Sequence, residues 1–581
     1  MKSINLIYLI AILLLFLSCS YKDKKANRPN IIVILSDDMG YSDVSSYGSE
    51  IQTPRLDKLA ENGVRFSQFY NTSRCVPTRA SLLTGLYPAQ TGAGFMTGDE
   101  HLPGYRGEIS KNTVTLAEVV KKSGYKTYMS GKWHITRNLD HTKDSLKYNW
   151  PIQRGFDKFY GTIIGAGSLW DPWTLSRGNT YITPENDPEY QSEEKWYYTD
   201  AISDNAVKYI REHVQETKDE QSPFFMYVSY TAPHWPLHAP EEEIALHKGK
   251  YDVGFQAIRE ARHDRLKEIG LIDENWELSD QTAKWDTLQN KEWHARNMEV
   301  YAAMITRMDK GIGKIIDELT EKELLDNTLI LYLQDNGGNA EVLSFFQIEN
   351  EYETPPKLPP FEPMGPNELQ TQMLPKQTRE GYPVIAMGKK IMAGNDQTYH
   401  AYGPAWANVS NTPFRLYKHY IQEGGIATPL IAHWPKAIKD HGAIRHQPGH
   451  VIDIMPTVVD VSGATYPDEH EGNEIIPMEG VSLRDVLINN ESIDRETIYF
   501  EHEGNRGLRK GKWKLVSKGY DNAGYFRRTD TIPMDQWALY DLEKNRTETN
   551  DLAAENQDLV KELTDLWYKW AKRTNTIPKP K

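Results

Sequence analysis

Residues 30–40 read NIIVILSDDMG, an aliphatic and largely β-branched run that ends in two adjacent aspartates. Pro29 precedes the run, and its side chains do not alternate between apolar and polar. This pattern predicts a strand that is buried on both faces, as in a parallel sheet with helices on either side.

The chain on either side of this segment alternates between strand and helix patterns. Helices are expected over residues 54–60, 115–122, 200–213 and 300–319, and strands over residues 125–130, 224–230 and 328–333. Alternation of this kind specifies a largely parallel sheet covered on both faces. We therefore predict an α/β fold, a large mostly parallel sheet sandwiched by helices, with a smaller C-terminal α+β subdomain.

Two regions depart from the alternation. Residues 337–411 have little periodicity and are rich in Pro, Gly, Tyr and Gln, and a loop region of that length is usually functional. After about Pro477 the sequence changes to short strands and a terminal helix with an apolar face, formed by Leu559, Leu563, Leu566 and Trp570. We expect a catalytic domain over residues 29–477, with an insertion at about 337–411, and a subdomain over residues 478–581.

The composition excludes several classes of protein. Among 581 residues, 67 Lys and Arg stand against 81 Asp and Glu, which gives a net charge of −14. This acidic balance argues against a nucleic-acid partner, because sequence-independent nucleic-acid binding needs a basic face. Hydrophobic residues at 39% and charged residues at 25% are typical of a globular protein, which excludes wholesale disorder and a polytopic membrane protein.

The N-terminus has the pattern of an export signal. Lys2 precedes an apolar run from Ile4 to Leu17, which is shorter than the ~20 residues that span a bilayer as a helix. Cys19 follows directly, and this arrangement resembles the lipobox of bacterial lipoproteins, in which that cysteine is lipidated. We expect residues 1–18 to be removed, residues 19–28 to form a polar tether, and the protein to be periplasmic or membrane-anchored through this lipid alone. The alternative is an ordinary cleaved signal peptide.

Polar side chains follow four of the predicted strands. They belong to the segments Asp37-Asp38, Gly131-Lys132-Trp133-His134, Ala232-Pro233-His234 and Asp335-Asn336. The carboxyl ends of parallel strands meet at one edge of a sheet, so we expect these side chains to converge on one crevice.

The oxygen-bearing members of this group predict a metal site. Two adjacent aspartates repel each other unless a cation compensates, and with Asp335 and Asn336 they form an all-oxygen set that suits Ca²⁺ or Mg²⁺. Zinc would favour His or Cys ligands. Pro236 separates His234 from His238, so these two are not a helical zinc pair.

Cys75 lies in the segment NTSRCVPTRASLLTG, residues 71–85. Pro77 suits the first turn of a helix, which places Cys75 at the helix N-terminus, where free N–H groups favour an anion. Arg79 adds a fork of hydrogen-bond donors one turn further along. The reactive position would therefore face an anionic ligand beside a metal.

This segment matches the C-x-P-x-R…T-G signature and resembles the formylglycine-dependent sulfatases of the alkaline phosphatase superfamily. The resemblance extends in order through the four strand ends and on to Asn411-Thr412-Pro413-Phe414-Arg415-Leu416-Tyr417-Lys418. The chain is most similar to the bacterial arylsulfatases, whose long insertion falls between the Asp-Asn pair and this last lysine. The resemblance implies an alkaline-phosphatase-like sheet.

The resemblance also implies roles for single residues. A maturation enzyme would oxidise Cys75 to formylglycine, whose hydrate is the nucleophile. One Ca²⁺ would be held by Asp37, Asp38, Asp335 and Asn336, with residue 75 at the same metal. Arg79 would hold the hydrate and His134 would take its hydroxyl proton during sulfate release. Lys132 and Lys418 would neutralise sulfate oxygens, and His234 would protonate or hydrogen-bond the leaving oxygen.

The expected function is hydrolysis of sulfate esters, with a sulfated saccharide or an aryl sulfate as substrate. A phosphodiesterase or phosphonate monoesterase of the same superfamily is the alternative enzyme, because some of these also use formylglycine. From another class, a non-catalytic glycan-binding lipoprotein would use some of the 15 Trp and 33 Tyr as sugar-stacking surfaces.

Overall fold

The computed structural model describes residues 28–218, 220, 222–343, 360–388, 391–519, 536–578 and 580. The expected signal peptide, residues 1–18, and Cys19 lie outside the described residues, as does all of the tether except residue 28. Within the described ranges, no helix combines the length and the apolarity that crossing a membrane requires.

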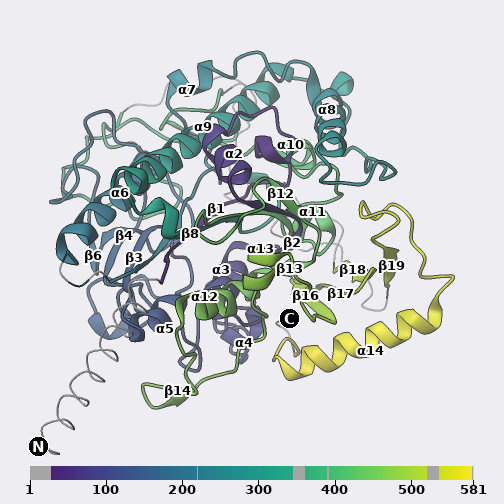
Figure 1. The fold of residues 1–581 in the computed structure, drawn as a ribbon. Helices are drawn as coiled ribbons and strands as arrows, with labels where there is room; N and C mark the ends of the chain where they lie inside the picture. The colour runs from purple at the N-terminus through teal and green to yellow at the C-terminus, as the bar shows by residue number, and fades with distance from the viewer. Residues whose placement is uncertain are drawn as a thin grey trace, which may run out of the picture.

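A sheet of 11 strands runs through the middle of the described part of the chain (Figure 1). Strand β1 (Asn30–Ser36) lies at its centre and pairs in parallel with β7 (Phe224–Ser229) and β8 (Thr328–Gln334). Strand β3 (Lys126–Gly131) continues the parallel arrangement beyond β7, and β4 (Lys158–Thr162) follows it. These strands therefore present their carboxyl ends at the same edge.

The two flanks of the sheet are mixed. Beyond β8, β11 (Ala427–His433) is antiparallel to both β8 and β2 (Val64–Tyr70). The remaining strands are short: β12 (Ala443–Arg445) and β13 (Gly449–His450) on β2, and β5 (Leu175–Arg177) and β6 (Thr180–Tyr181) beyond β4. The full order is β12-β2-β11-β8-β1-β7-β3-β4-β5-β6, with β13 off this path on β2.

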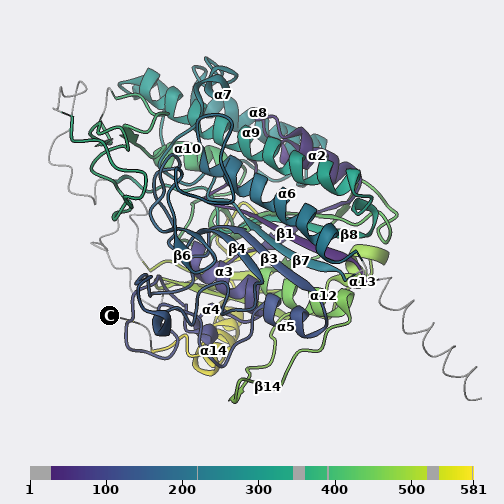
Figure 2. The same ribbon diagram turned by 90° about the vertical axis from the view of Figure 1, so that its left-hand side faces the viewer.

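Helices cover both faces of the sheet (Figure 2). One layer contains α2 (Pro54–Glu61), α6 (Tyr198–Glu216) and α9 (Lys291–Glu321); the other contains α3 (Cys75–Thr84), α5 (Leu116–Lys122) and α12 (Ile454–Ser462). Side chains alternate along a strand, so Ile32 and Ile34 of β1 join the core of the first layer, whereas Ile31, Val33 and Leu35 join that of the second.

The other elements are shorter or lie at the periphery. The helices are α4 (Pro88–Thr91), α7 (Glu241–Ala245), α8 (Gly254–Glu268), α10 (Gly403–Ser410), α11 (Glu423–Ile426) and α13 (Arg484–Asn489). Two strand pairs complete them: β9 (Ile385–Ala386) with β10 (Thr398–Tyr399), and β14 (Glu469–His470) with β15 (Asn473–Glu474).

The C-terminal region forms a separate antiparallel sheet with one helix on it. The sheet contains β16 (Thr497–His502), β17 (Asn505–Lys510), β18 (Trp513–Ser517) and β19 (Ala538–Asp541) in that order. Helix α14 (Gln557–Arg573) buries Leu563, Trp567 and Trp570 against it. The large, mostly parallel sheet and this smaller subdomain confirm the predicted fold class.

Strand β1 coincides with its predicted limits, whereas α9 begins nine residues before its predicted start. Sequence reasoning missed β11, because Pro429 lacks an N–H and is unusual inside a sheet. In the structure, the pairing with β2 shifts register between Thr428 and Leu430, so the proline lies at an irregularity.

A buried ionic cluster joins the subdomain to the main domain. Glu423 of α11 pairs with Lys514 of β18 at 2.7 Å and with Arg546 at 2.6 Å, and Lys514 also pairs with Glu548 at 2.7 Å. All four side chains are fully buried. Removing one charge from such a cluster leaves its partner charged and unpaired in a medium that solvates it poorly.

We predict that Lys514→Met lowers the free energy of unfolding by about 3–5 kcal/mol, because two buried carboxylates lose their shared cation. Adding Glu548→Gln to this variant should restore part of the loss. Lys512→Met is the matched control, because this lysine, just before the same strand, is 39% exposed and pairs with a single carboxylate, that of Asp541. Denaturant unfolding measures the difference; equal small effects of the two lysine variants would contradict the prediction.

Candidate active site

The four strand ends converge as predicted. Asp37 and Asp38 follow β1, Lys132 and His134 follow β3, His234 follows β7, and Asp335 and Asn336 follow β8. Because these strands are parallel neighbours, all of these residues lie at one edge of the sheet. Each of their side chains is buried, and so are those of Cys75, Arg79 and Lys418.

The oxygen-bearing residues form one contiguous group. The backbone N–H of Asp38 donates to Oδ1 of Asp335 at 3.2 Å, and Nδ2 of Asn336 donates to Oδ1 of Asp38 at 2.8 Å. Within the part of the chain that the structure describes, two buried oxygens of this group, Asp37 Oδ1 and Asn336 Oδ1, accept no hydrogen bond. Oxygens that are buried and unpaired in this way fit a hard cation such as Ca²⁺.

Three cations hold this acidic group together. Lys132 Nζ donates to Oδ2 of Asp37, and Nη2 of Arg79 lies 3.3 Å from that oxygen and 2.9 Å from Oδ2 of Asp335. Lys418 Nζ lies 2.6 Å from Oδ1 of Asp38. The predicted lysines and arginine are therefore in direct contact with the predicted metal ligands.

This environment shifts the pKa values of Asp37 and Asp335 in opposite directions. Burial alone raises the pKa of Asp37, but Lys132, His234 and Arg79 outweigh burial and bring the pKa below its ordinary value. For Asp335, burial and the neighbouring charge of Asp37 raise the pKa above its ordinary value. A metal cation beside the pair, in addition to these side chains, would relieve this repulsion.

Cys75 is the first residue of α3, as the position of Pro77 predicted. Its thiol is buried and unbridged. Burial raises the pKa of the thiol, although the nearby charges of Lys132, Lys418 and Arg74 act to lower it. A neutral thiol is a weak nucleophile, so the unmodified cysteine is poorly suited to attack an ester.

The two predicted histidines present different faces to the site. His134 has a left-handed backbone (φ 60°), and burial together with Lys132 and Arg79 holds its pKa well below the ordinary value, so its imidazole is neutral. Among the described residues, its Nδ1 has no hydrogen-bond partner. His234 donates through Nδ1 to the carbonyl of Trp235 at 2.6 Å, which leaves Nε2 at 3.2 Å from Oδ2 of Asp38.

Two residues that sequence reasoning missed complete the acidic group. Nδ2 of Asn339 donates to Oδ2 of Asp38 at 2.5 Å and to Oε2 of Glu341 at 2.9 Å. Both follow the predicted ligand Asn336 within five residues, and both are fully buried. Two polar residues just after a predicted metal loop were the available signal.

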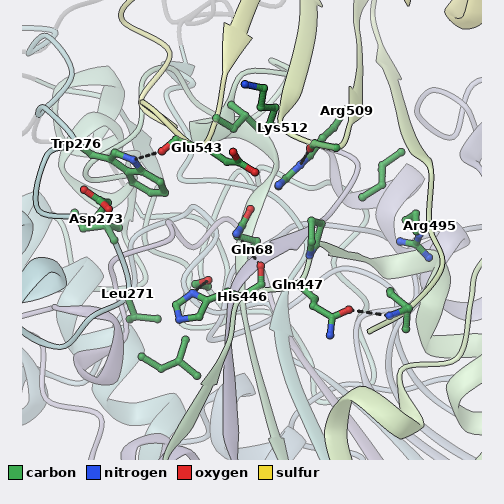
Figure 3. A pocket seen from close by; sticks show the side chains of 18 of the residues that line it. Gln68, Leu271, Asp273, Trp276, His446, Gln447, Arg495, Arg509, Lys512 and Glu543 are labelled. Atoms are coloured by element: carbon green, nitrogen blue, oxygen red, sulfur yellow. Dashed lines mark hydrogen bonds between the residues drawn. The ribbon is translucent and has the colours of Figure 1, made fainter. Parts of the chain in front are cut away.

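A cavity of about 900 Å³ lies elsewhere, between the edge of the large sheet and the C-terminal subdomain (Figure 3). Gln68, Trp276, His446, Arg509 and Lys512 are among the side chains that line it, and none of the predicted site residues does. Its basic residues already have partners, for example Tyr70 for Arg509, Asp541 for Lys512 and Asp453 for Arg495. The cavity therefore does not contain the chemistry that the strand ends carry.

Comparison with known proteins agrees with this site. The family model described as Sulfatase matches residues 29–464, and that described as N-sulphoglucosamine sulphohydrolase, C-terminal, matches residues 414–572. An uncharacterized sulfatase of Schizosaccharomyces pombe is 30% identical, covering 96% of this chain and 96% of its own length. The arylsulfatase of Klebsiella aerogenes is 33% identical, covering 78% of this chain and 91% of its own.

Solved structures share the fold at lower identity. Ps i-CgsB, in complex with k-i-k-neocarrahexaose, superposes with a TM-score of 0.61 at 23% identity, covering 95% of this chain and 98% of its own. The phosphonate monoester hydrolase of Agrobacterium radiobacter has a TM-score of 0.53 at 17% identity, covering 94% and 96%. Both proteins share the fold with this chain, so the fold alone does not select the family, and the sequence matches do. The chain belongs to the sulfatase family, and it is a sulfuric ester hydrolase.

We predict that Gly165→Ala lowers kcat on a sulfate ester by about tenfold or more. A Cβ at this position would lie 2.0 Å from Cε1 of His134, so the imidazole must move, and displacements of about 1 Å in an active site can cost about 10² in rate. Gly365→Ala is the control, because no atom lies within 4 Å of its Cβ. Steady-state kinetics of both variants check the prediction, and equal activity would refute it.

Proposed function

We propose that this chain cleaves sulfate esters through a formylglycine formed at Cys75, with one Ca²⁺ held by Asp37, Asp38, Asp335 and Asn336. The observation that carries the proposal is the position of Cys75. It begins α3 beside Lys132, Lys418 and Asp37, whose charges act on its thiol, while Asp37 Oδ1 and Asn336 Oδ1 accept no hydrogen bond in the described structure.

Transfer of the sulfate group to residue 75 and its later release use two hydroxyl groups on one carbon. One hydroxyl of the aldehyde hydrate attacks sulfur and gives its proton to Asp335. At the same time the bond from sulfur to the leaving oxygen breaks, and His234 gives that oxygen a proton. The second hydroxyl then loses its proton to His134 as the C=O bond forms again and sulfate departs with the first oxygen. Water adds to the aldehyde and restores the hydrate, so no water needs to attack sulfur.

The remaining residues supply charge and orientation. Lys132 and Lys418 would neutralise the sulfate oxygens, and Arg79 would hold the hydrate close to Asp335. Bound Ca²⁺ would supply Lewis-acid polarisation at a sulfate oxygen. Charges that are fixed in a buried site stabilise a developing anion without reorganising, which is commonly the largest contribution to catalysis.

We further propose that the substrate is a sulfated saccharide. Support comes from relatives that act on sugars: N-acetylgalactosamine-6-sulfatase of Homo sapiens is 24% identical over 81% of this chain, and a protein solved with its substrate D-glucosamine-2-N,6-O-disulfate has a TM-score of 0.57 at 21% identity. A formylglycine-generating enzyme would be the maturation partner. The N-terminal sequence supports export to the periplasm or to a membrane through lipidated Cys19.

Mass spectrometry of active protein tests the nucleophile and the anchor together. The peptide that contains residue 75 should carry an aldehyde or its hydrate, and Cys75→Ala should abolish sulfate release while the melting temperature stays close to that of the unchanged protein. The N-terminal peptide should begin at a lipidated Cys19. A fully active sample that contains only the Cys75 thiol would overturn the nucleophile, and a mature N-terminus beyond Cys19 would overturn the anchor.

Turnover across a substrate panel tests the substrate class. We expect release of sulfate from at least one defined sulfated mono- or oligosaccharide with kcat/KM well above that for an aryl sulfate. An aryl phosphodiester and a phosphonate monoester form the matched arm for the alternative activity. Activity confined to the phosphorus esters would refute the sulfate assignment, and activity confined to the aryl sulfate would refute the saccharide.

A further inference from the structure

Glu341 is a buried carboxylate at the centre of five polar contacts. It accepts hydrogen bonds from Nη1 of Arg74 at 2.9 Å, Nε1 of Trp235 at 2.8 Å, Nδ2 of Asn339 at 2.9 Å and Nε2 of His419 at 3.0 Å. Nζ of Lys418 lies 3.7 Å away. Its side chain is 2% exposed, so these groups take the place of water around the charge.

The carboxylate is ionised in this environment. Burial alone raises the pKa of Glu341, but Lys418, Arg74 and His419 outweigh burial and hold the pKa well below its ordinary value. A buried carboxylate stays charged only where neighbouring cations and hydrogen-bond donors compensate for the water that it has lost. The function proposed above gives Glu341 no role, and Glu341 lies outside the four strand-end segments.

Each partner of Glu341 is one step from a residue of the proposed chemistry. Arg74 is the N-cap of α3 and directly precedes Cys75. Trp235 directly follows His234; their ring centroids are 4.4 Å apart, and its carbonyl accepts the hydrogen bond from His234 Nδ1.

Two of the other three partners, Asn339 and Lys418, lead to the proposed metal group. Asn339 divides its amide between Glu341 and Asp38, and Lys418 lies between the same two carboxylates, 2.6 Å from Asp38 and 3.7 Å from Glu341. Glu341 and Asp38 therefore compete for one lysine. If Glu341 lost its charge, the positive charge of Lys418 would act on Asp38 with less compensation.

We propose that Glu341 is a positioning residue whose negative charge divides Lys418 between two carboxylates and so sets how strongly the site holds its cation and its sulfate group. The inference rests on the proposed function, because it takes Ca²⁺ and sulfate as the ligands. It makes a prediction of opposite sign for the two ligands. Without the charge of Glu341, Lys418 and Arg74 repel a cation at Asp38 and attract an anion more strongly.

The test is Glu341→Gln, which keeps the shape of the side chain and removes its charge. Calorimetric titration of the metal-depleted, formylglycine-bearing chain with Ca²⁺ alone should give a Kd raised by about tenfold. Inorganic sulfate, used as an inhibitor, should bind several-fold more tightly to the variant. On a sulfate ester, kcat should fall because the charged groups of the site are no longer aligned. KM should not rise, because the substrate anion is attracted more strongly in the ground state.

Two further variants separate charge from damage to the fold. Glu341→Asp keeps the charge and should leave the Ca²⁺ Kd within about threefold of the unchanged chain. Arg74→Gln removes a cation from the same cluster, so its Ca²⁺ Kd should fall and its sulfate inhibition constant should rise. This second variant tests the charge argument even where Glu341→Gln fails to fold.

The matched control is Glu243→Gln on α7, a buried glutamate that pairs with Arg307 and Lys310 and contacts none of the site residues named above. It should leave both affinities unchanged. Parallel weakening of Ca²⁺ and sulfate in Glu341→Gln, or unchanged affinities for both, would overturn the inference. If the variant gives such a result while the unchanged chain binds Ca²⁺ and releases sulfate, the inference fails and the proposed function stands. If the unchanged chain binds neither Ca²⁺ nor inorganic sulfate, both fail.

Discussion

The structure depends on keeping three carboxylates of neighbouring strands in contact at one buried edge. Asp37 and Asp38 follow β1 and Asp335 follows β8, and Asp38 donates its own N–H to Asp335. At these separations, carboxylates in a weakly solvating interior repel each other strongly. Arg79, Lys132 and Lys418 compensate part of this repulsion from three different segments. Among the described residues, Oδ1 of Asp37 and Oδ1 of Asn336 accept no hydrogen bond, which fits the cation proposed above.

The topology brings these charges together without exposing them to water. Parallel pairing of β3, β7, β1 and β8 sets four loops side by side, and α3 begins beneath them with Cys75. Close backbone approaches make this packing possible. A Cβ on Gly337 would meet the carbonyl oxygen of Gly424 at 1.9 Å, so only glycine lets the loop after β8 lie against α11. The site is therefore built from backbone contacts as much as from side chains.

The sequence predicted where the candidate site residues lie better than it predicted the sheet. Residues 30–36 and Cys75 lie where their local patterns placed them, because a buried apolar run and a proline in the first helical turn act over a few residues. Strand β11 escaped prediction, since Pro429 is tolerated only through a register shift against β2, which is a tertiary feature. Glu341 escaped for the same reason. Its place just after Asn336 was the one local signal, but its partners Arg74 and His419, which surround it as a buried anion, are far from it in sequence.

The C-terminal subdomain is connected to this site by two series of contacts. In the first series, Lys514 and Arg546 pair with Glu423 of α11. The carbonyl of Gly425 in that helix accepts the N–H of Gly337, next to Asn336. In the second series, Glu503 of the β16–β17 turn pairs with Nδ1 of His419 at 2.9 Å, and His419 pairs through Nε2 with Glu341. Both routes end on charged groups around Asp38 and Asn336. The large sheet therefore supplies the proposed metal ligands, and the subdomain contacts the backbone and the counter-charges around them.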